Sequence, residues 1–180
     1  MKAVILADKY SKETIKDIVN HYRKYGINEI IICVSTEKEV IEENEKNGLK
    51  IIYAGVGREY STARELEKIK GLLGSEPFFI TFGDYICDLD LSNFICFHKR
   101  NSLVLSASVI KKDEKNYISG GFLIADSDIF EYITDKSKGI EIDVLSRIGE
   151  DGEIAFYVYK GSYKSIYARK KVYEIIKPKI

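Results

Sequence analysis

Short apolar runs alternate with amphipathic segments over the first 110 residues of the chain. The runs are rich in Ile, Val and Phe and are too short to cross a membrane, so they predict buried strands. A run that is apolar at every position is typical of a strand covered on both faces of a sheet. The predicted strands span residues 3–6, 30–34, 50–54, 78–82 and 103–110.

The segments between these strands carry apolar residues at every third or fourth position, which predicts helices. The clearest example places Ile15, Ile18, Val19 and Tyr22 on one face of a helix that ends near Gly26. Further helices are predicted from Ser61 or Thr62 to Leu73 and from Leu91 to Arg100, and a charged surface helix is predicted from Glu37 to Asn47, closed by Gly48.

The alternation of strands and helices predicts a single α/β domain over residues 1–180, with three α/β/α layers around a doubly wound, mostly parallel sheet. Beyond Lys111 the spacing becomes less regular, which favours a mixed sheet there. The elements expected in this part are a strand at 121–124, short helices at 129–133 and 142–148, a strand at 154–159 and a C-terminal helix at 168–176.

Composition excludes several classes of protein. Lys plus Arg and Asp plus Glu both number 28, so no net charge would attract nucleic acid or an acidic membrane. We expect a cytoplasmic protein, because no transmembrane run or signal-peptide pattern is present. Cys33, Cys87 and Cys96 lack zinc or disulfide spacing and are expected in or near the core, whereas His21 and His98 are expected at the surface.

The strand at 78–82 ends at Gly83 and Asp84. In open α/β sheets the ligand cleft lies beyond the carboxyl ends of the parallel strands, so Asp84 could hold a divalent cation bound to a phosphorylated ligand. The alternative is a polar loop that simply follows a core strand. No Walker A, G-x-S-x-G or G-x-G-x-x-G motif offers a different active site.

Six segments, in the same order along nearly the whole chain, resemble the sugar-1-phosphate nucleotidyltransferases (NDP-sugar pyrophosphorylases), most closely the glucose-1-phosphate cytidylyltransferases. The segments are Met1–Ala7, Tyr25–Cys33, Glu76–Asp84, Phe97–Lys99, Ile118–Phe122 and Lys171–Tyr173. The resemblance implies a Rossmann-like nucleotide-diphospho-sugar transferase fold. It also implies a reaction that joins a nucleoside triphosphate to a sugar 1-phosphate, with Mg²⁺ bound at Asp84.

The departures from this family fall on its chemistry. In the family a Gly-rich loop follows the first strand, where its amides cradle the triphosphate and its Arg neutralises charge on the leaving pyrophosphate. Here Ala7 leads through Asp8 to a helix at Ser11 with no glycine between. Losing such preorganised groups costs on the order of a thousandfold or more in rate. A second metal-binding Asp is expected at 164–168, where no carboxylate occurs, so Asp84 alone would give a weak Mg²⁺ site.

The resemblance also marks candidate substrate-binding residues, each of which has a plainer structural explanation. Thr62 begins a segment, Thr62–Glu65, that borders the nucleotide base in the family and that also has the spacing of a helix-capping box. The other candidates are Gly83, Lys115, Gly120, Gly121 and Glu141. Lys115 could instead be a solvated lysine in a turn, and Glu141 an exposed acid at the start of a helix. Gly120 and Gly121 could simply be turn glycines, since the Ser119 before them replaces an Asn that contacts the sugar in the family.

Three hypotheses follow, and no catalytic residue is assigned in any of them. In the preferred one the chain is a degenerate nucleotidyltransferase-like protein, or pseudoenzyme, that binds a nucleotide or sugar phosphate and regulates or scaffolds sugar-nucleotide metabolism. The second is an active transferase that makes an NDP-sugar and pyrophosphate. The third is a protein-interaction module with an occluded cleft. Mg²⁺ is the one candidate cofactor. The chain could form a homo-oligomer or bind a protein partner, and we do not expect it to bind nucleic acid or a membrane.

Overall fold

The strands and helices of the computed structural model alternate along most of the chain. The structure describes residues 1–6, 12–35, 41–45, 48–57, 61–82, 85–111, 113, 116–161 and 163–165. The strands are β1 (Lys2–Leu6), β2 (Glu29–Val34), β3 (Ile41–Glu45), β4 (Leu49–Gly55), β5 (Phe78–Phe82), β6 (Tyr85–Cys87), β7 (Leu105–Lys111), β8 (Tyr117–Ala125), β9 (Ile154–Tyr159) and β10 (Tyr163–Ser165). The helices are α1 (Lys12–Lys24), α2 (Thr62–Lys68), α3 (Lys70–Leu73), α4 (Leu91–Asn101), the 3₁₀-helix η1 (Ser127–Tyr132), the π-helix η2 (Ile140–Val144) and α5 (Leu145–Glu150).

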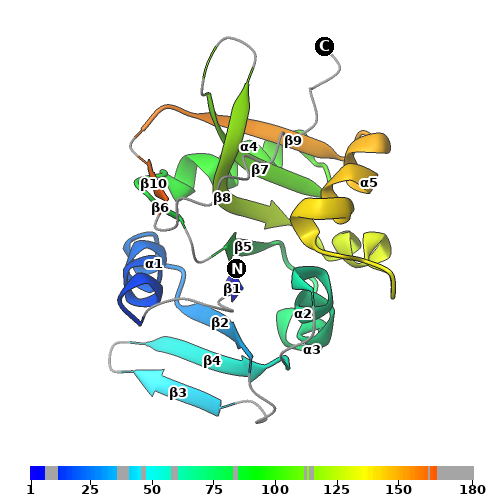
Figure 1. Ribbon diagram of the computed structural model, residues 1–180. Coiled ribbons are helices and arrows are strands. Elements are labelled where there is room, and N and C mark those ends of the chain that lie inside the picture. The colour runs from blue at the N-terminus through cyan, green and yellow to red at the C-terminus, as the bar shows by residue number, and fades with distance from the viewer. Residues whose placement is uncertain are drawn as a thin grey trace.

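Eight of the described strands form one sheet in the order β3-β4-β2-β1-β5-β8-β7-β9 (Figure 1). The pairs β4-β2, β2-β1, β1-β5 and β7-β9 are parallel, whereas β3 and β8 run antiparallel to their neighbours. A second pairing joins β6 and β10. This mixed, mostly parallel sheet confirms the predicted fold class.

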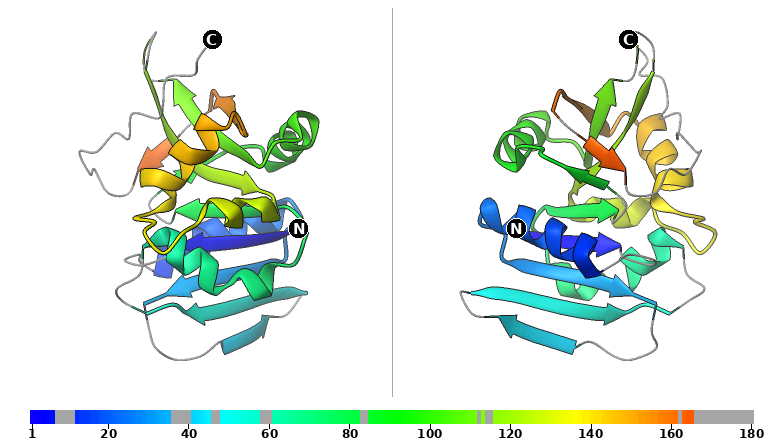
Figure 2. Two further views of the ribbon diagram at one scale, coloured as in Figure 1. Left: turned by 90° about the vertical axis from the view of Figure 1, so that its right-hand side faces the viewer. Right: turned by 60° about the vertical axis from the view of Figure 1, so that its left-hand side comes forward.

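Helices cover both faces of the sheet, as the two views of Figure 2 show. One face carries α1 and α4, whose buried side chains pack with Ile30, Ile32 and Phe79. The other face carries α2, α3, η1, η2 and α5, which pack with Val4, Ile31 and other residues of the sheet. The central strands β1, β2 and β5 are buried on both sides, as their continuous apolar sequences predict.

The chain winds outward from β1 in both directions. From β1 it crosses through α1 to β2 on one side, and from β4 it returns through α2 and α3 to β5 on the other. The helices of these two crossovers lie on opposite faces, so the strand order reverses at β1. Such a reversal leaves a crevice at the carboxyl ends of the central strands, where ligands of open α/β sheets bind.

The predicted surface helix from Glu37 to Asn47 is wrong, because the structure places strand β3 within it. β3 pairs antiparallel with β4, and the connection between them is a tight hairpin that contains Gly48 at φ +75°. A glycine with positive φ suits a short hairpin as well as it suits a helix C-terminus. Pairing with the edge of a sheet therefore overrode the helical preference of a Glu-rich segment.

The predicted helix from residue 61 to Leu73 exists, but it is interrupted at Ile69, which separates α2 from α3. Ser61 caps α2, since its hydroxyl accepts a hydrogen bond from the Arg64 N–H at 3.4 Å. The capping box predicted from Thr62 to Glu65 is wrong, because the cap lies one residue earlier. The predicted C-terminal helix at 168–176 lies outside the described residues.

The two histidines and Cys96 also differ from expectation. His98 is only 3% exposed and His21 is half-buried against Tyr25 and Phe122, so neither is a surface residue. Cys33 and Cys87 are buried as predicted, but Cys96 is exposed on α4. Within the described ranges, no helix is long and apolar enough to span a membrane.

Candidate functional site

The candidate site is the carboxyl edge of the central strands, where β1 and β5 end side by side at Leu6 and Phe82. Three of the predicted site residues, Gly83, Asp84 and Lys115, lie outside the described residues. The others, Thr62, Gly120, Gly121 and Glu141, are described and come from three separate elements. Strand β8 and the N-terminus of α2 bring these elements to the same edge of the sheet.

Gly120 and Gly121 lie at this edge because β8 runs antiparallel to β5. Thr81 pairs with Phe122 in the last pair of the ladder, so the two glycines that precede Phe122 in β8 lie next to the end of β5. Opposite them, on the other side of β8, the register with β7 shifts around Ser108. The Ser108 hydroxyl donates to the Phe122 carbonyl at 2.8 Å and accepts from the Phe122 N–H at 3.2 Å, which holds this irregularity in place.

Each glycine of the pair has its own structural reason. A Cβ on Gly120 would lie 2.6 Å from Oγ of Ser108, closer than real side chains approach one another. Gly121 has φ +80°, a conformation that favours glycine, and its N–H donates to the Ser119 hydroxyl at 3.1 Å. The predicted contact with a sugar is untested, but close packing against Ser108 accounts for Gly120, and the backbone conformation accounts for Gly121.

The N-terminus of α2 lies against the segment that leads into η2. The Ser61 hydroxyl donates to the Ser137 carbonyl at 2.8 Å, and the Ile140 N–H donates to Oγ1 of Thr62 at 2.9 Å. A Cβ on Gly139 would lie 3.1 Å from Oγ1 of Thr62, so a glycine there permits the close approach. Thr62, a predicted substrate-binding residue, thus contributes its oxygen to a contact within the protein.

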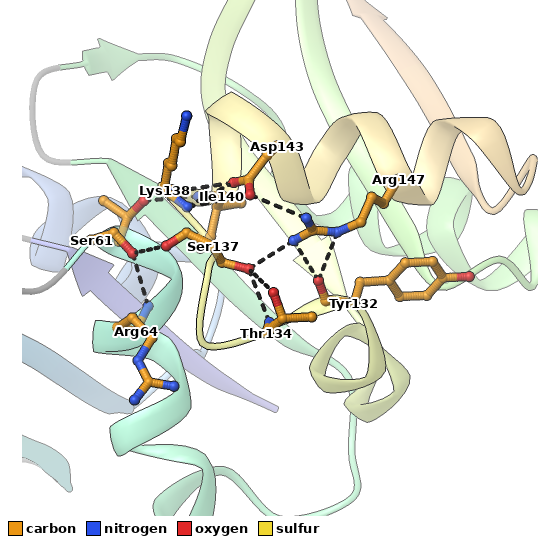
Figure 3. A network of polar contacts seen from close by, with 11 residues as sticks. Ser61, Arg64, Tyr132, Thr134, Ser137, Lys138, Ile140, Asp143 and Arg147 are labelled. Atoms are coloured by element: carbon orange, nitrogen blue, oxygen red, sulfur yellow. Dashed lines mark hydrogen bonds and ion pairs between the residues drawn. The ribbon is translucent and has the colours of Figure 1, made fainter.

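A network of hydrogen bonds holds this segment from the other side (Figure 3). The Arg147 guanidinium donates to the Tyr132 carbonyl through Nε at 3.1 Å and Nη2 at 2.8 Å, and to the Ser137 hydroxyl at 2.7 Å. Its Nη1 pairs with Asp143 at 3.1 Å. We call the connected set the polar clasp; its members are Ser61, Thr62, Tyr132, Thr134, Ser137, Lys138, Gly139, Ile140, Asp143 and Arg147.

Asp143 anchors the turn that precedes η2. Its carboxylate accepts hydrogen bonds from the Lys138 N–H at 3.1 Å and the Gly139 N–H at 3.1 Å. Burial acts to raise the pKa of Asp143, but these N–H groups and the charge of Arg147 outweigh it, so the pKa lies below its ordinary value. Glu141, predicted from the resemblance as a substrate-binding residue, is half-buried in η2, directly after this turn.

A buried carboxylate lies beneath the start of α2. Glu65, in the first turn of the helix, is 3% exposed and close enough to Cys33 to contribute to its electrostatics. Burial, and secondarily the charge of Glu65, raise the pKa of the Cys33 thiol. A carboxylate in the first turn of a helix is favoured by the helix dipole, which offsets part of the cost of burial.

Strand β10 lies beside the position that follows Asp84. Ser165 pairs with Tyr85 and Lys164 pairs with Ile86, so β10 lies close to the end of β5. The family resemblance places a second metal-binding carboxylate at this point of the chain. The residues there are Lys164 and Ser165, which supply no carboxylate. Among the described residues, no cluster of three His, Cys, Asp or Glu side chains could hold a metal ion.

A separate groove of about 730 Å³ opens along the outer face of α1. Of the predicted site residues that the structure describes, Thr62, Gly120, Gly121 and Glu141, none lines it, and its walls carry charges of both signs. The lining residues are Asp17, Asn20, His21, Arg23, Lys24, Cys87 and Asp88. Cys87, which lines the groove, also contacts the Gly120 carbonyl through its sulfur at 4.0 Å.

Comparison with known proteins finds relatives that align with most of the chain. It is 24% identical over 212 aligned positions to the probable glucose-1-phosphate cytidylyltransferase of Bacillus subtilis, covering 92% of this chain and 84% of that protein. The chain is thus similar over most of its length to a sugar-1-phosphate nucleotidyltransferase. It is 23% identical to the mannose-1-phosphate guanylyltransferase catalytic subunit beta of Xenopus tropicalis, of which it spans only about half, 54%.

Solved structures agree on the fold of this nucleotidyltransferase relative. A putative glucose-1-phosphate thymidylyltransferase from Bacillus anthracis, in complex with a sucrose, superposes with a TM-score of 0.74. The match covers 92% of this chain and 89% of that one at 14% identity, which shows a shared fold. No family model matches the chain.

Sequence reasoning missed the Arg147 half of the polar clasp in this nucleotidyltransferase-like chain. Asp143 and Arg147 are four residues apart, which is the spacing of an ion pair on a helix, and this signal could have been recognised. The bonds from Arg147 to Tyr132 and Ser137 depend on how the loop folds back. No local pattern in the sequence predicts these two contacts.

Proposed function

We propose that this chain is a degenerate member of its family that binds a nucleotide or a sugar phosphate, with transferase activity impaired or lost. Its role would be to regulate or scaffold sugar-nucleotide metabolism. The observation that carries the proposal is the pairing of β10 with β6, which lays Lys164 and Ser165 beside the residue after Asp84. Where the family resemblance calls for a second carboxylate, this chain offers a lysine and a serine.

A Mg²⁺ ion that bridges phosphate oxygens is usually held by one or two protein carboxylates together with the phosphates of the substrate. Asp84 is the single acid that the resemblance assigns to this role. The donors available at this edge therefore do not make a metal site in the absence of a phosphorylated ligand. Any Mg²⁺ would arrive with its ligand.

The connection between β1 and α1 supports the same conclusion. β1 ends at Leu6 and α1 begins at Lys12, so five residues, Ala7 to Ser11, join them, and none is a glycine. A cradle of backbone amides around a triphosphate relies on conformations that glycine adopts most readily. Without that cradle and its arginine, the leaving pyrophosphate loses its preorganised stabilisation.

The test is thermal melting with CTP, UTP, dTTP and GTP, each with glucose 1-phosphate or mannose 1-phosphate, in the presence and absence of Mg²⁺. A ligand that binds only the folded state stabilises it by about 2.7 kcal/mol at a hundred times its Kd. We expect a shift with at least one pair of ligands and no release of pyrophosphate. Asp84→Ala should abolish the Mg²⁺-dependent part, whereas Asp17→Ala, which removes an exposed acid from α1, should not.

Two other outcomes would favour the competing functions. Release of pyrophosphate at a steady rate would show an active transferase, which is what the names of the relatives suggest. If no nucleotide or sugar phosphate changed the melting temperature, the proposal would fail. A protein-interaction module with a closed cleft would then be the better reading, because the polar clasp already joins α2 to η2.

A further inference from the structure

Arg147 makes its four hydrogen bonds to residues of the segment from Tyr132 to Asp143. That segment in turn contacts the N-terminus of α2. The guanidinium donates two of these bonds to the Tyr132 carbonyl, one to the Ser137 hydroxyl and one to Asp143. These partners lie before and after the turn at 138–139. Arg147 therefore ties together both ends of the segment that leads from η1 to η2.

The tied segment has little freedom left. The Ser137 hydroxyl that accepts from Arg147 also accepts from the Thr134 N–H at 2.9 Å. The Asp143 carboxylate that accepts from Arg147 also accepts from the Lys138 and Gly139 N–H groups. Ser137 is buried, and Gly139 and Ile140 are buried with it. The position of the Ser137 carbonyl and of the Ile140 N–H is thus fixed by the arginine.

Those two backbone groups are the ones that meet α2. The Ser137 carbonyl accepts from Ser61, and the Ile140 N–H donates to Thr62. A second link between the same elements is the ion pair between Arg64 and Asp135 at 3.0 Å, but Asp135 is 93% exposed, so this pair contributes little. The two part-buried hydrogen bonds are the links that depend on the shape of the Arg147-bound segment.

We propose that Arg147 is a positioning residue, which sets the N-terminus of α2 and the π-helix that carries Glu141 in one fixed geometry at the carboxyl edge. Glu141 lies in η2, whose first residue is the one bonded to Thr62. The effect on ligand binding rests on the function proposed above, whereas the effect on the position of α2 and η2 does not. Lysine cannot replace arginine in this role. A single ammonium group cannot present the planar fork that reaches Tyr132, Ser137 and Asp143 together.

The first test is amide hydrogen exchange of the full chain, comparing wild type with Arg147→Lys. We expect exchange to rise about tenfold or more at the amides held by the clasp, which are those of Thr134, Lys138, Gly139 and Ile140. It should rise also at Arg64 and Glu65, whose amides are bonded to Ser61 and which Arg147 does not touch. Arg100→Lys, on the exposed side of α4, is the matched control and should change none of these amides.

Thr62→Val separates the two steps of the proposal. It removes the acceptor for Ile140 and should raise exchange at Ile140, while Thr134, Lys138 and Gly139 stay protected because Arg147 still holds them. The proposal is overturned if Arg147→Lys leaves Arg64 and Glu65 unchanged, whether or not the loop itself loosens. If Arg147→Lys unfolded the whole chain, Ser137→Ala would carry the test, with the same expected pattern and the same contrary result.

The second test addresses the ligand. For the nucleotide and sugar 1-phosphate pair that stabilises the wild type, we expect Arg147→Lys to weaken binding about tenfold and Arg100→Lys to leave it unchanged. An unchanged Kd in Arg147→Lys, with the exchange pattern altered, would overturn the link to binding. If the wild type shows no ligand-dependent shift, the proposed function fails, while the exchange experiment still decides whether Arg147 positions α2.

Discussion

The backbone N–H of Ile140 donates a hydrogen bond of 2.9 Å to Oγ1 of Thr62, a residue 78 positions earlier in the chain. The family resemblance marks the same threonine as a candidate substrate-binding residue. In the folded chain its oxygen instead completes the backbone of η2, which would otherwise begin with an unsatisfied donor. The two halves of the crevice edge are therefore joined through a side chain.

Replacing Thr62 with valine tests that joint. Valine keeps the size and shape of threonine but removes the acceptor, so the buried Ile140 N–H is left without its partner. We expect the free energy of unfolding to fall by about 1–2 kcal/mol, as measured by urea denaturation. Ser92→Ala, on the exposed surface of α4, should change it by less than about 0.5 kcal/mol. Equal losses in the two variants would contradict a structural role for Thr62.

Two glycines in different surroundings give a matched comparison. Gly120→Ala places a Cβ 2.6 Å from Oγ of Ser108, so the pairing of β7 and β8 must shift, at a cost of about 1–3 kcal/mol. Gly71→Ala, in α3, meets no atom within 4 Å and replaces a flexible residue in a helix, so it should stabilise the protein by about 0.5–1 kcal/mol. Urea denaturation of both variants measures the difference. Tolerance of Gly120→Ala would show that the close approach to Ser108 is not needed.

The stability of the protein should decrease in mild acid because of His98. Burial lowers the pKa of His98 below its ordinary 6.5, despite the nearby Asp126 at 3.6 Å, so the folded state binds a proton less readily than the unfolded chain. The stabilisation is fully present above pH 6.5 and is lost as the pH falls from there through the folded-state pKa.

Unfolding free energies measured across this range for wild type and His98→Gln provide the check. Glutamine can still bond to Ser106 but does not titrate, so the variant should lose part of the slope. The pKa of His21 is also lowered, mainly by burial, so His21→Gln should remove another part. Parallel curves for wild type and His98→Gln would contradict the assignment.

The three cysteines should differ in reactivity toward iodoacetamide. Burial raises the pKa of Cys87 to about 11 and also raises that of Cys33, and both side chains are shielded from solvent, whereas Cys96 is exposed. Because the thiolate is the nucleophile, we expect one adduct per native chain, on Cys96, and three in urea. Mass spectrometry of wild type and Cys96→Ser identifies the site. Labelling of Cys33 under native conditions would show that the space between α2 and the sheet opens.

The sequence predicted best those elements that are defined by burial alone. The apolar run at 78–82, predicted as part of a strand that ends at Asp84, forms β5 with all five residues buried, because such a run leaves few other ways to bury it. It failed where local preference and long-range pairing disagree. Residues 41–45 are rich in glutamate and favour a helix, yet they pair with β4. No local pattern could reveal that partner.

The residues of the candidate site also include some that the sequence predicted and some that it missed. Gly120 and Gly121 were recognised by their type, and their positions at the carboxyl edge follow from the sheet. Arg147 and Ser137 were not recognised, because polar residues on a short helix and in a loop are usually solvated. His98 was expected at the surface for the same reason, but it bonds to Ser106 inside the fold. Buried polar partners are set by tertiary geometry, which single residues do not encode.

The polar clasp also has a consequence for the order of folding. Its bonds join residues separated by 76 and 78 positions, whereas the hairpin of β3 and β4 closes over a few residues. The entropy lost on closing a loop grows with its length, and contacts between distant residues form late. We expect Ser61 and Thr62 to have φ-values near zero in the folding transition state. During synthesis, the contact between α2 and η2 would be completed only once residue 147 has left the ribosome.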